Sequence, residues 1–491
     1  MKPVLRFENV TITYPNGYCA ARDVSFEIEA GECLALAGES GCGKTTMAKA
    51  SLGLLPRGTS VSGSILIRSV EIAGASERTL RSVRGVKAGY VAQEPFSACD
   101  PLRTVGDHIA EAWRVHGTRP PDGAVISLLT KLGIVEPEES ARRYPHQWSG
   151  GMLQRAVIAA ASALRPPLII ADEPTSALDS DLAGATLEAL RATGAAILLI
   201  THDLRLAALY ADRIAVCRNG RIVEIGDAAT TLKAPQHPYT IELLDASIHK
   251  LQRPPLISND ADVVVEARHI SKIRGSGRRA VTAVADANMA VRRGEIVGVC
   301  GPSGCGKSTL LRMLATIEPP SGGTILLNGS TRPARNGFVT PVFQDAGGSL
   351  DRRWPVWRSI TEPLMASHRK ESPTSASLAR GERRNIARAR LAEVGLSGID
   401  PEARPDELSV GQCQRVAIAR ALTAEPSLIV ADEPTSALDA PTAAGILRLL
   451  AKAAEKGASV IVVSHDRTML DARCHRVLSM REGRLGEYTT G

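Results

Sequence analysis

Aromatic residues are scarce in this sequence: Phe, Tyr and Trp together make up 3% of its 491 residues. Proteins that bind single-stranded nucleic acid use such side chains as stacking platforms for the bases, so the scarcity argues against that class of function. The net charge of +7 is modest for this length and does not indicate a basic nucleic-acid face. We therefore expect no nucleic-acid partner.

Long apolar runs are missing as well. The longest, such as AAILLI at residues 195–200, have the length of a strand, whereas roughly 18 apolar residues are needed to cross a bilayer. The N-terminal MKPVLRFENV carries charge at once and lacks the apolar core of a secretion signal. We expect a cytosolic chain without a transmembrane segment of its own, so any role at a membrane depends on a partner.

Clustered cysteines are the third absence. The nine cysteines are scattered, with no CxxC motif and no Cys/His group at zinc-binding spacing. This usage is typical of reduced thiols in the cytosol, and it argues against a disulfide framework or a zinc site.

An internal repeat organises what is present. The segment GESGCGKTT at Gly38–Thr46 recurs as GPSGCGKST at Gly301–Thr309, and ADEPTSALD at Ala171–Asp179 recurs letter for letter at Ala431–Asp439. The lysines of the first pair of segments are 263 residues apart, far more than one unit of a solenoid repeat. The period indicates two homologous domains, each large enough for its own core.

We predict a first domain over residues 1–244, a linker over 245–262 and a second domain over 263–491. The linker contains a Pro-Pro pair among polar residues, which is typical of an extended connector. Within each half, short apolar strands alternate with helical stretches. This order predicts an α/β fold around a parallel sheet that is buried on both faces.

A glycine-rich loop followed by lysine and a hydroxyl residue occurs in each half. Glycines let successive backbone N–H groups curl around phosphate oxygens, and the start of the next helix adds its positive end. The lysine reaches the β- and γ-phosphates of ATP, and the hydroxyl after it binds Mg2+. The residues that we assign to ATP are Gly38, Ser40, Gly41, Gly43, Lys44, Thr45 and Thr46 in the first half and Gly301, Ser303, Gly304, Gly306, Lys307, Ser308 and Thr309 in the second, with Mg2+ at Thr45 and Ser308.

Polar residues at the ends of the following strands complete the chemistry. In the first half, Asp172 ends an apolar run and is predicted to bind Mg2+, and Glu173 polarises the attacking water. His202 follows the next strand and is placed to contact the γ-phosphate, while Gln93 is assigned to both ATP and Mg2+. The counterparts in the second half are Asp432, Glu433, His465 and Gln344.

Four further features resemble the ATP-binding cassette family over nearly all of both halves. They are the signature-like stretches at Trp148–Arg155 and Leu408–Arg415, the SALD loops at Ser176–Asp179 and Ser436–Asp439, the glutamine loops and the histidine switches. The resemblance implies two tandem cassettes, each with a parallel core sheet, an antiparallel β part and a helical subdomain. It also implies a clamp in which the P-loop of one cassette faces the signature of the other. The signature residues that it assigns to ATP are Ser149, Gly150, Gly151, Ser409, Gly411 and Gln412.

Two stretches narrow the resemblance to the importers of peptides and nickel. They are YPHQWSGGMLQR at Tyr144–Arg155 and APQHPYTIELL at Ala234–Leu244. The branch implies two integral-membrane permeases and an extracytoplasmic solute-binding protein as partners, with this chain at the cytoplasmic face of the membrane. The segments after Gln93 and Gln344 are then expected to receive the permeases. Short peptides are the first expectation for the substrate, and nickel or a metal chelate is the alternative.

Two positions depart from the family pattern. Arg274 stands where the first half has Tyr14, the aromatic residue that the family stacks on adenine, and Val410 replaces the first signature glycine. A β-branched residue tolerates positive φ poorly, so the loop must adjust if that glycine has such a conformation. Head-to-tail pairing would join Lys44, Glu173 and His202 to Ser409, Val410 and Gly411, and Lys307, Glu433 and His465 to Ser149, Gly150 and Gly151. We expect the two sites to hydrolyse ATP at unequal rates.

Two other classes of twin-cassette protein remain as alternatives. Soluble factors that act on ribosomes have a long, strongly charged helical linker between the cassettes, whereas this connector is short and contains a Pro-Pro pair. DNA-repair cassette proteins carry zinc-binding CxxC pairs, and this sequence has none. Both observations favour the importer.

Overall fold

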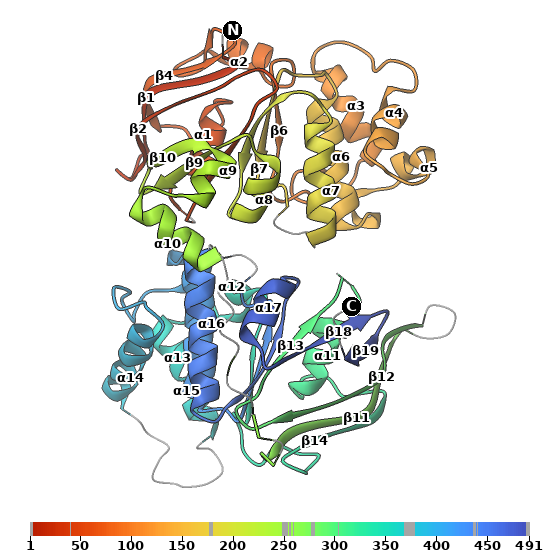
Figure 1. The fold of residues 1–491 in the computed structure, drawn as a ribbon, viewed down its shortest axis with the longest axis vertical. Helices are drawn as coiled ribbons and strands as arrows, with labels where there is room; N and C mark the ends of the chain where they lie inside the picture. Colours follow the sequence, from red (N-terminus) through yellow and green to blue (C-terminus); the bar gives the residue numbers. More distant parts are fainter. Residues whose placement is uncertain are drawn as a thin grey trace. The chain divides into compact units, whose positions relative to one another are not determined.

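The computed structural model of the chain describes residues 3–39, 41–175, 180–247, 254, 257–258, 260–275, 280–302, 304–367, 379–435, 438 and 440–487 (Figure 1). The chain divides into two compact units, a first unit of essentially residues 1–247 and a second unit formed by most of 248–491. Half of the predicted linker over 245–262 falls outside the described residues. No helix in the described part of the chain has the length and apolar character needed to span a membrane.

The first unit is built on a six-stranded sheet with the order β10-β9-β3-β8-β7-β6. Its strands run parallel except for the edge strand β10, which pairs antiparallel with β9. The strands are β3 (Cys33–Gly38), β6 (Ala88–Val91), β7 (Leu168–Asp172), β8 (Ala196–Ile200), β9 (Arg213–Arg218) and β10 (Arg221–Asp227).

The strands of this sheet have unbroken apolar sequences because both faces of the sheet are covered. In β7, Leu168 and Ile170 pack into one hydrophobic cluster, while Ile169 and Ala171 pack into another on the opposite face. Alternate side chains of a strand point to opposite faces, so a strand buried on both sides reads as an unbroken apolar run. This confirms the predicted α/β fold with a doubly covered parallel sheet.

An antiparallel sheet of order β2-β1-β4-β5 covers one face together with α1. In this layer the rings of Phe7 and Phe26 stack with their centroids 4.5 Å apart, and Met47 of α1 is fully buried. The elements are β1 (Leu5–Thr13), β2 (Cys19–Ile28), α1 (Lys44–Ala50), β4 (Ser60–Ile67), β5 (Val70–Glu71) and α2 (Glu77–Val83).

Helices gather at the other side of the unit and form the predicted helical subdomain (Figure 1). Ile109, Leu129 and Leu153 from three of these helices share a buried cluster with Ile197 of β8. The helices are α3 (Val105–Val115), α4 (Ala124–Lys131), α5 (Pro137–Arg142), α6 (Gly150–Ser162) and α7 (Ser180–Arg191), followed later in the chain by α8 (Leu204–Tyr210), α9 (Ala228–Lys233) and α10 (Pro238–Ser247).

The second unit repeats this plan with a core sheet of order β15-β16-β17-β13-β18-β19 and a three-stranded sheet of order β12-β11-β14. Strand β16 again divides its side chains between two clusters, with Val430 on one face and Ile429 on the other. Its strands are β11 (Val263–Arg274), β12 (Val281–Arg292), β13 (Ile296–Cys300), β14 (Gly322–Leu327), β15 (Val339–Val342), β16 (Leu428–Asp432), β17 (Ser459–Val463), β18 (Arg476–Arg481) and β19 (Arg484–Glu487). Its helices are α11 (Lys307–Leu314), α12 (Ala346–Ser349), α13 (Val356–Ser367), α14 (Arg380–Glu393), α15 (Val410–Thr423), α16 (Ala440–Glu455) and α17 (Arg467–Arg473).

Candidate functional site

Each P-loop joins a central strand to a helix, β3 to α1 in the first unit and β13 to α11 in the second. Glycine is required at the last position of each loop, because the backbone of a neighbouring strand lies close to it. A Cβ on Gly43, which has φ of 102°, would lie 2.0 Å from the carbonyl oxygen of Ala20. A Cβ on Gly306 would lie 2.1 Å from the carbonyl oxygen of Ala283. No other residue type fits either position without moving the neighbouring strand.

The P-loop lysines are held by the loops from which they come. The buried ammonium of Lys44 donates to the carbonyl oxygens of Gly38 and Glu39, both at 2.8 Å. Lys307 donates in the same way to Gly301 at 2.7 Å and to Pro302 at 2.9 Å. A buried cation needs acceptors, and these carbonyls supply them while holding the charge at the mouth of the loop.

Asp172 lies at the end of β7 and receives two hydrogen bonds. Thr45 Oγ1 donates to one carboxylate oxygen at 3.0 Å, and the Tyr90 hydroxyl donates to the other at 3.0 Å. Burial raises the pKa of Asp172, although both hydrogen bonds oppose the shift. The structure thus brings together the hydroxyl and the carboxylate that were assigned to Mg2+. Sequence reasoning missed Tyr90, whose only signal was its place three residues before Gln93.

The glutamates after these strands have an unusual backbone. Glu173 has φ of 46° and Glu433 has φ of 45°, in the left-handed region that residues with side chains rarely adopt. Their N–H groups donate at 3.0 Å to the carbonyl oxygens of Ile200 and Val463 on the neighbouring strands. Strained conformations of this kind persist only where the surrounding structure holds them, and they concentrate at functional sites.

A glutamine and a histidine converge on each glutamate. In the first unit, Gln93 Nε2 donates to Glu173 Oε2 at 3.0 Å, and His202 Nδ1 lies 3.4 Å from the same oxygen. Burial raises the pKa of Glu173, but the hydrogen bond from His202 and the charges of His202 and Lys44 outweigh it and hold the pKa below the ordinary value. Each glutamate is therefore kept as a carboxylate, the form that can accept a proton from water.

The second unit repeats this cluster. Gln344 Nε2 donates to Glu433 Oε2 at 3.2 Å, and His465 Nδ1 lies 3.5 Å from that oxygen. Burial also raises the pKa of Asp432, and a hydrogen bond from Ser308 opposes the shift. The structure thus brings the predicted carboxylates, glutamines and histidines together in both units.

The signature serines cap helices. Ser149 Oγ accepts from Met152 N at 3.3 Å at the start of α6. Ser409 Oγ accepts from Gln412 N at 3.3 Å at the start of α15, and the Gln412 side chain accepts from Ser409 N at 2.8 Å. In the described part of the chain, the hydrogen bonds of both serine side chains stay within the turn that they cap, so these residues do not join the P-loop of their own unit.

Val410 fits its position without strain. Its counterpart Gly150 is the first residue of α6 and does not have positive φ, and Val410 likewise opens α15 without positive φ. The conformational difficulty considered from the sequence therefore does not arise. What Val410 changes is the surface, because the residue is 64% exposed and adds an isopropyl group where Gly150 has no side chain.

The residues at the aromatic position differ between the units. The Tyr14 hydroxyl hydrogen-bonds Thr46 Oγ1 at 2.9 Å, and its ring stacks with that of Tyr18 at a centroid distance of 6.4 Å. Arg274 instead pairs with Glu318 at 3.0 Å and reaches Thr309 Oγ1 at 3.4 Å. The guanidinium is thus engaged by a carboxylate at the place where the first unit presents an aromatic ring.

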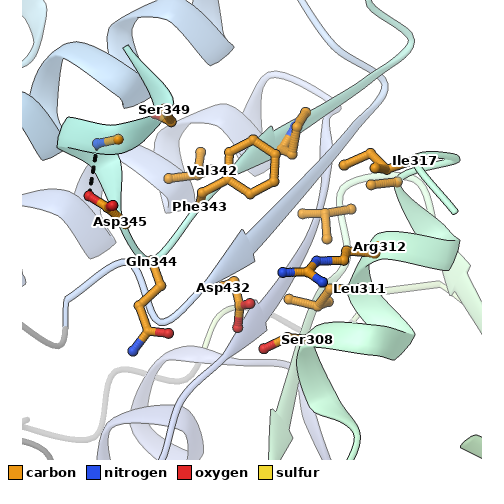
Figure 2. Close-up of a pocket in the computed structure, with 14 residues that line it drawn as sticks. Ser308, Leu311, Arg312, Ile317, Val342, Phe343, Gln344, Asp345, Ser349 and Asp432 are labelled. Carbon is orange, nitrogen blue, oxygen red and sulfur yellow. Dashed lines mark hydrogen bonds between the residues drawn. The ribbon is translucent and has the colours of Figure 1, made fainter. Parts of the chain in front are cut away.

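A cavity of about 450 Å3 opens beside the residues of the second unit that the sequence assigned to Mg2+. In the lower half of Figure 2, Gln344, Asp432 and Ser308 lie below Phe343. Pro341 also lines it and pairs with Val430 in the same register in which Tyr90 pairs with Ile170. Because proline has no hydroxyl, Asp432 lacks the second hydrogen bond that Tyr90 gives to Asp172.

Some predicted residues lie outside the part of the chain that the structure describes. They are Ser40 and Ser303 of the P-loops and, in the SALD loops, residues 176–179, 436, 437 and 439.

Two P-loop units, each with an acidic strand end and a Gln–Glu–His cluster, define the class of protein: a tandem P-loop ATPase. A family model described as "ABC transporter" matches residues 21–176 and again 284–436. The chain belongs to the ABC transporter family, as the sequence predicted.

Curated relatives match over nearly the whole chain. The oligopeptide transport ATP-binding protein OppD of Mycobacterium tuberculosis is 34% identical over 593 residues, covering 99% of this chain and 95% of that protein. The uncharacterized ABC transporter ATP-binding protein YejF of Escherichia coli is 38% identical over 517 residues, with coverages of 99% and 95%. The glutathione import ATP-binding protein GsiA of Salmonella typhimurium is 36% identical over 523 residues, with coverages of 95% and 82%.

A solved structure with both cassettes also matches. The archaeal ribosome recycling factor aABCE1, solved with the ribosomal stalk protein aP1, superposes with a TM-score of 0.66 at 21% identity, covering 97% of this chain and 89% of that chain. An identity this low shows a shared fold alone and says nothing about ribosomes for this chain.

Proposed function

We propose that this chain is the ATP-hydrolysing subunit of an importer that takes up short peptides. The observation that carries the proposal is the Gln–Glu–His cluster, built twice at the strand end beside a P-loop lysine. Similarity to the oligopeptide transport and glutathione import ATP-binding proteins supports peptides as the class of substrate. Nickel or a metal chelate is the less favoured alternative.

In this proposal each P-loop binds the phosphates of one ATP through its backbone N–H groups and its lysine, Lys44 or Lys307. Glu173 and Glu433 orient and deprotonate the attacking water, and His202 and His465 contact the γ-phosphate. These four residues are the catalytic ones.

The strand-end residues fit a magnesium ion, which would neutralise phosphate charge. Thr45 Oγ1 and Asp172 Oδ1 lie 3.0 Å apart, and both are oxygen donors of the kind that Mg2+ prefers. In the first unit we assign the ion to Thr45, Asp172 and Gln93, and in the second to Ser308, Asp432 and Gln344. The fit rests on the type of donor and on their proximity.

The proposed coupling to transport follows from the γ-phosphate. If the P-loop of each cassette and the signature of the other bind one ATP, closure of the clamp requires the γ-phosphate and hydrolysis reverses it. The partners would be two membrane permeases and, through them, a solute-binding protein, with this chain peripheral at the cytoplasmic face. Exposed apolar side chains after Gln93, Phe96 and Leu102, support a permease contact there.

Transport by the assembled system tests the proposal. The chain would be reconstituted in vesicles with the permeases and the binding protein of its own system, and uptake of labelled dipeptides, tetrapeptides and nickel compared. We expect ATP-dependent uptake of peptide that is lost in the Lys44→Ala, Lys307→Ala double variant. Uptake of nickel without peptide would favour the alternative, and ATPase activity unchanged in the double variant would contradict the assignment of the P-loops.

A further inference from the structure

The last helix of the first unit reaches the P-loop. Helix α10 begins at Pro238, within the HPYT stretch, and Tyr239 of its first turn is fully buried. The backbone N–H of Glu39, the second residue of the P-loop, donates to the Tyr239 hydroxyl at 3.0 Å. The two residues are 200 positions apart in the chain.

The peptide group that Tyr239 contacts is the one that holds the P-loop lysine. The N–H of Glu39 and the carbonyl of Gly38 belong to the same peptide plane, and that carbonyl accepts from Lys44 Nζ at 2.8 Å. Hydrogen bonds in series polarise one another, so an acceptor for the N–H makes the carbonyl a better acceptor for Lys44. Tyr239 also fixes the orientation of this plane.

The tyrosine is itself held firmly. The guanidinium of Arg218, an exposed residue, lies 4.5 Å from the centroid of the buried ring in a cation–π contact. Just before α10, the Glu224 carboxylate on β10 accepts from Gln236 N at 2.8 Å and His237 N at 3.2 Å. The segment that carries Tyr239 is therefore fastened to the core sheet and can serve as a fixed support.

In the second unit, the peptide group that holds the P-loop lysine is oriented in a different way. Lys307 is held by the carbonyls of Gly301 and Pro302, as Lys44 is by those of Gly38 and Glu39. Pro302 occupies the position of Glu39, and proline has no N–H and a fixed φ. The peptide plane between Gly301 and Pro302 thus has no donor for any tyrosine to accept, and its rigidity comes from the proline ring.

We infer that Tyr239 is a positioning residue for the first nucleotide site, which aligns Lys44 through the peptide between Gly38 and Glu39. The inference rests on the proposed role of the first P-loop as an ATP site. The inference assigns a structural role to the HPYT stretch, residues 237–240. Nucleotide affinity then depends on α10 in the first unit, and nucleotide affinity in the second unit is independent of α10.

Measurements of ATP binding to the full-length Lys307→Ala chain test this inference. The substitution weakens the second site, so the measured affinity is that of the first P-loop. We expect Tyr239→Phe, which keeps the ring and its contact with Arg218, to weaken ATP binding roughly three- to tenfold. The matched control Tyr210→Phe, on α8, should leave the affinity unchanged. An unchanged affinity in Tyr239→Phe would overturn the inference.

A double-mutant cycle separates positioning from general stability. In a Glu39→Pro background the N–H is gone, so Tyr239→Phe should have no further effect. If Glu39→Pro does not fold, the steady-state kinetics of ATP hydrolysis by Tyr239→Phe decide. A positioning role raises KM for ATP and largely preserves kcat. A loss of folded protein lowers kcat alone, and that result overturns the inference. The Lys44→Ala, Lys307→Ala chain identifies the other failure, since ATP binding that survives there contradicts the proposed ATP sites themselves.

Discussion

Nδ1 of His465 lies 3.5 Å from Oε2 of Glu433, the residue that we propose as the catalytic base of the second unit. His202 and Glu173 repeat the pair at 3.4 Å in the first unit. In both units the histidine follows a strand next to the one that precedes the glutamate, and parallel strands bring their carboxyl ends to one edge. The pair is therefore a consequence of the sheet topology and not of local sequence.

This pair predicts a pH dependence. The hydrogen bond with Glu433, with burial opposing, raises the pKa of His465 above its ordinary value of 6.5. A raised histidine pKa means that the folded state binds the proton more tightly, so its stabilisation is full below pH 6.5 and is lost as pH rises through the folded-state pKa. Burial raises the pKa of Glu433, but the bond from His465 and the charges of His465 and Lys307 bring it below 4.5, so the carboxylate persists above that pH.

We expect His465→Gln to destabilise the second unit most between pH 4.5 and 6.5, and progressively less at higher pH. Urea unfolding of the full chain at a series of pH values, followed through the transition of the second unit, measures this. His269→Gln, at an exposed pair with Asp286, is the control and should have little effect throughout. A penalty for His465→Gln that stays constant from pH 5 to pH 9 would contradict the raised pKa.

Replacing each proposed base tests whether the two sites are equal. Glu173→Gln and Glu433→Gln should each slow ATP hydrolysis at the affected site by about 100-fold or more while ATP still binds, since the amide cannot accept a proton. Because Arg274 and Val410 distinguish the sites, we expect the two variants to leave different residual rates in the assembled transporter. Equal losses, together with no change of rate in Val410→Gly, would refute unequal turnover.

Arg274 predicts weaker base stacking in the second unit. Its guanidinium is paired with Glu318 at 3.0 Å, so stacking on adenine would require it to leave that carboxylate. In a Lys44→Ala background, Arg274→Tyr should tighten ATP binding by roughly fivefold or more, because stacking on an aromatic ring contributes about 1–3 kcal/mol. Calorimetric titration measures the affinity. Weaker binding in Arg274→Tyr would instead assign the guanidinium a direct role in binding the nucleotide.

The P-loop thiols should differ in reactivity. A hydrogen bond from the Cys217 thiol and the nearby Lys44 ammonium lower the pKa of Cys42, although burial opposes them. In the second unit, Met480 takes the place of Cys217 behind the loop. We expect N-ethylmaleimide to label Cys42 roughly tenfold faster than Cys305 at pH 7, with protection by ATP, as read by mass spectrometry. Cys217→Ala should move the labelling of Cys42 to higher pH, and equal rates for the two thiols would contradict the prediction.

Much of the fold and many of the candidate site residues can be predicted from the sequence alone. The P-loops, the acidic strand ends and the doubly buried strands were predictable because each depends on a few adjacent residues: a glycine where a Cβ would strike a neighbouring strand, or an unbroken apolar run. The repeat then identified His202 and His465 as a pair, because they are separated by the same number of residues as the P-loop lysines. The family and the tandem organisation follow from these local patterns without any knowledge of packing.

Only the tertiary structure decided how those residues act on one another. Tyr90 reaches Asp172 across 82 residues and Tyr239 reaches the P-loop across 200, and no local pattern predicts contacts of that separation. The positive φ of Glu173 and Glu433 and the unstrained backbone of Val410 likewise depend on the neighbouring strand or the helix start. Local chemistry determines which groups are available, whereas long-range packing determines which hydrogen bonds and charges surround each one, and those set its orientation and its pKa.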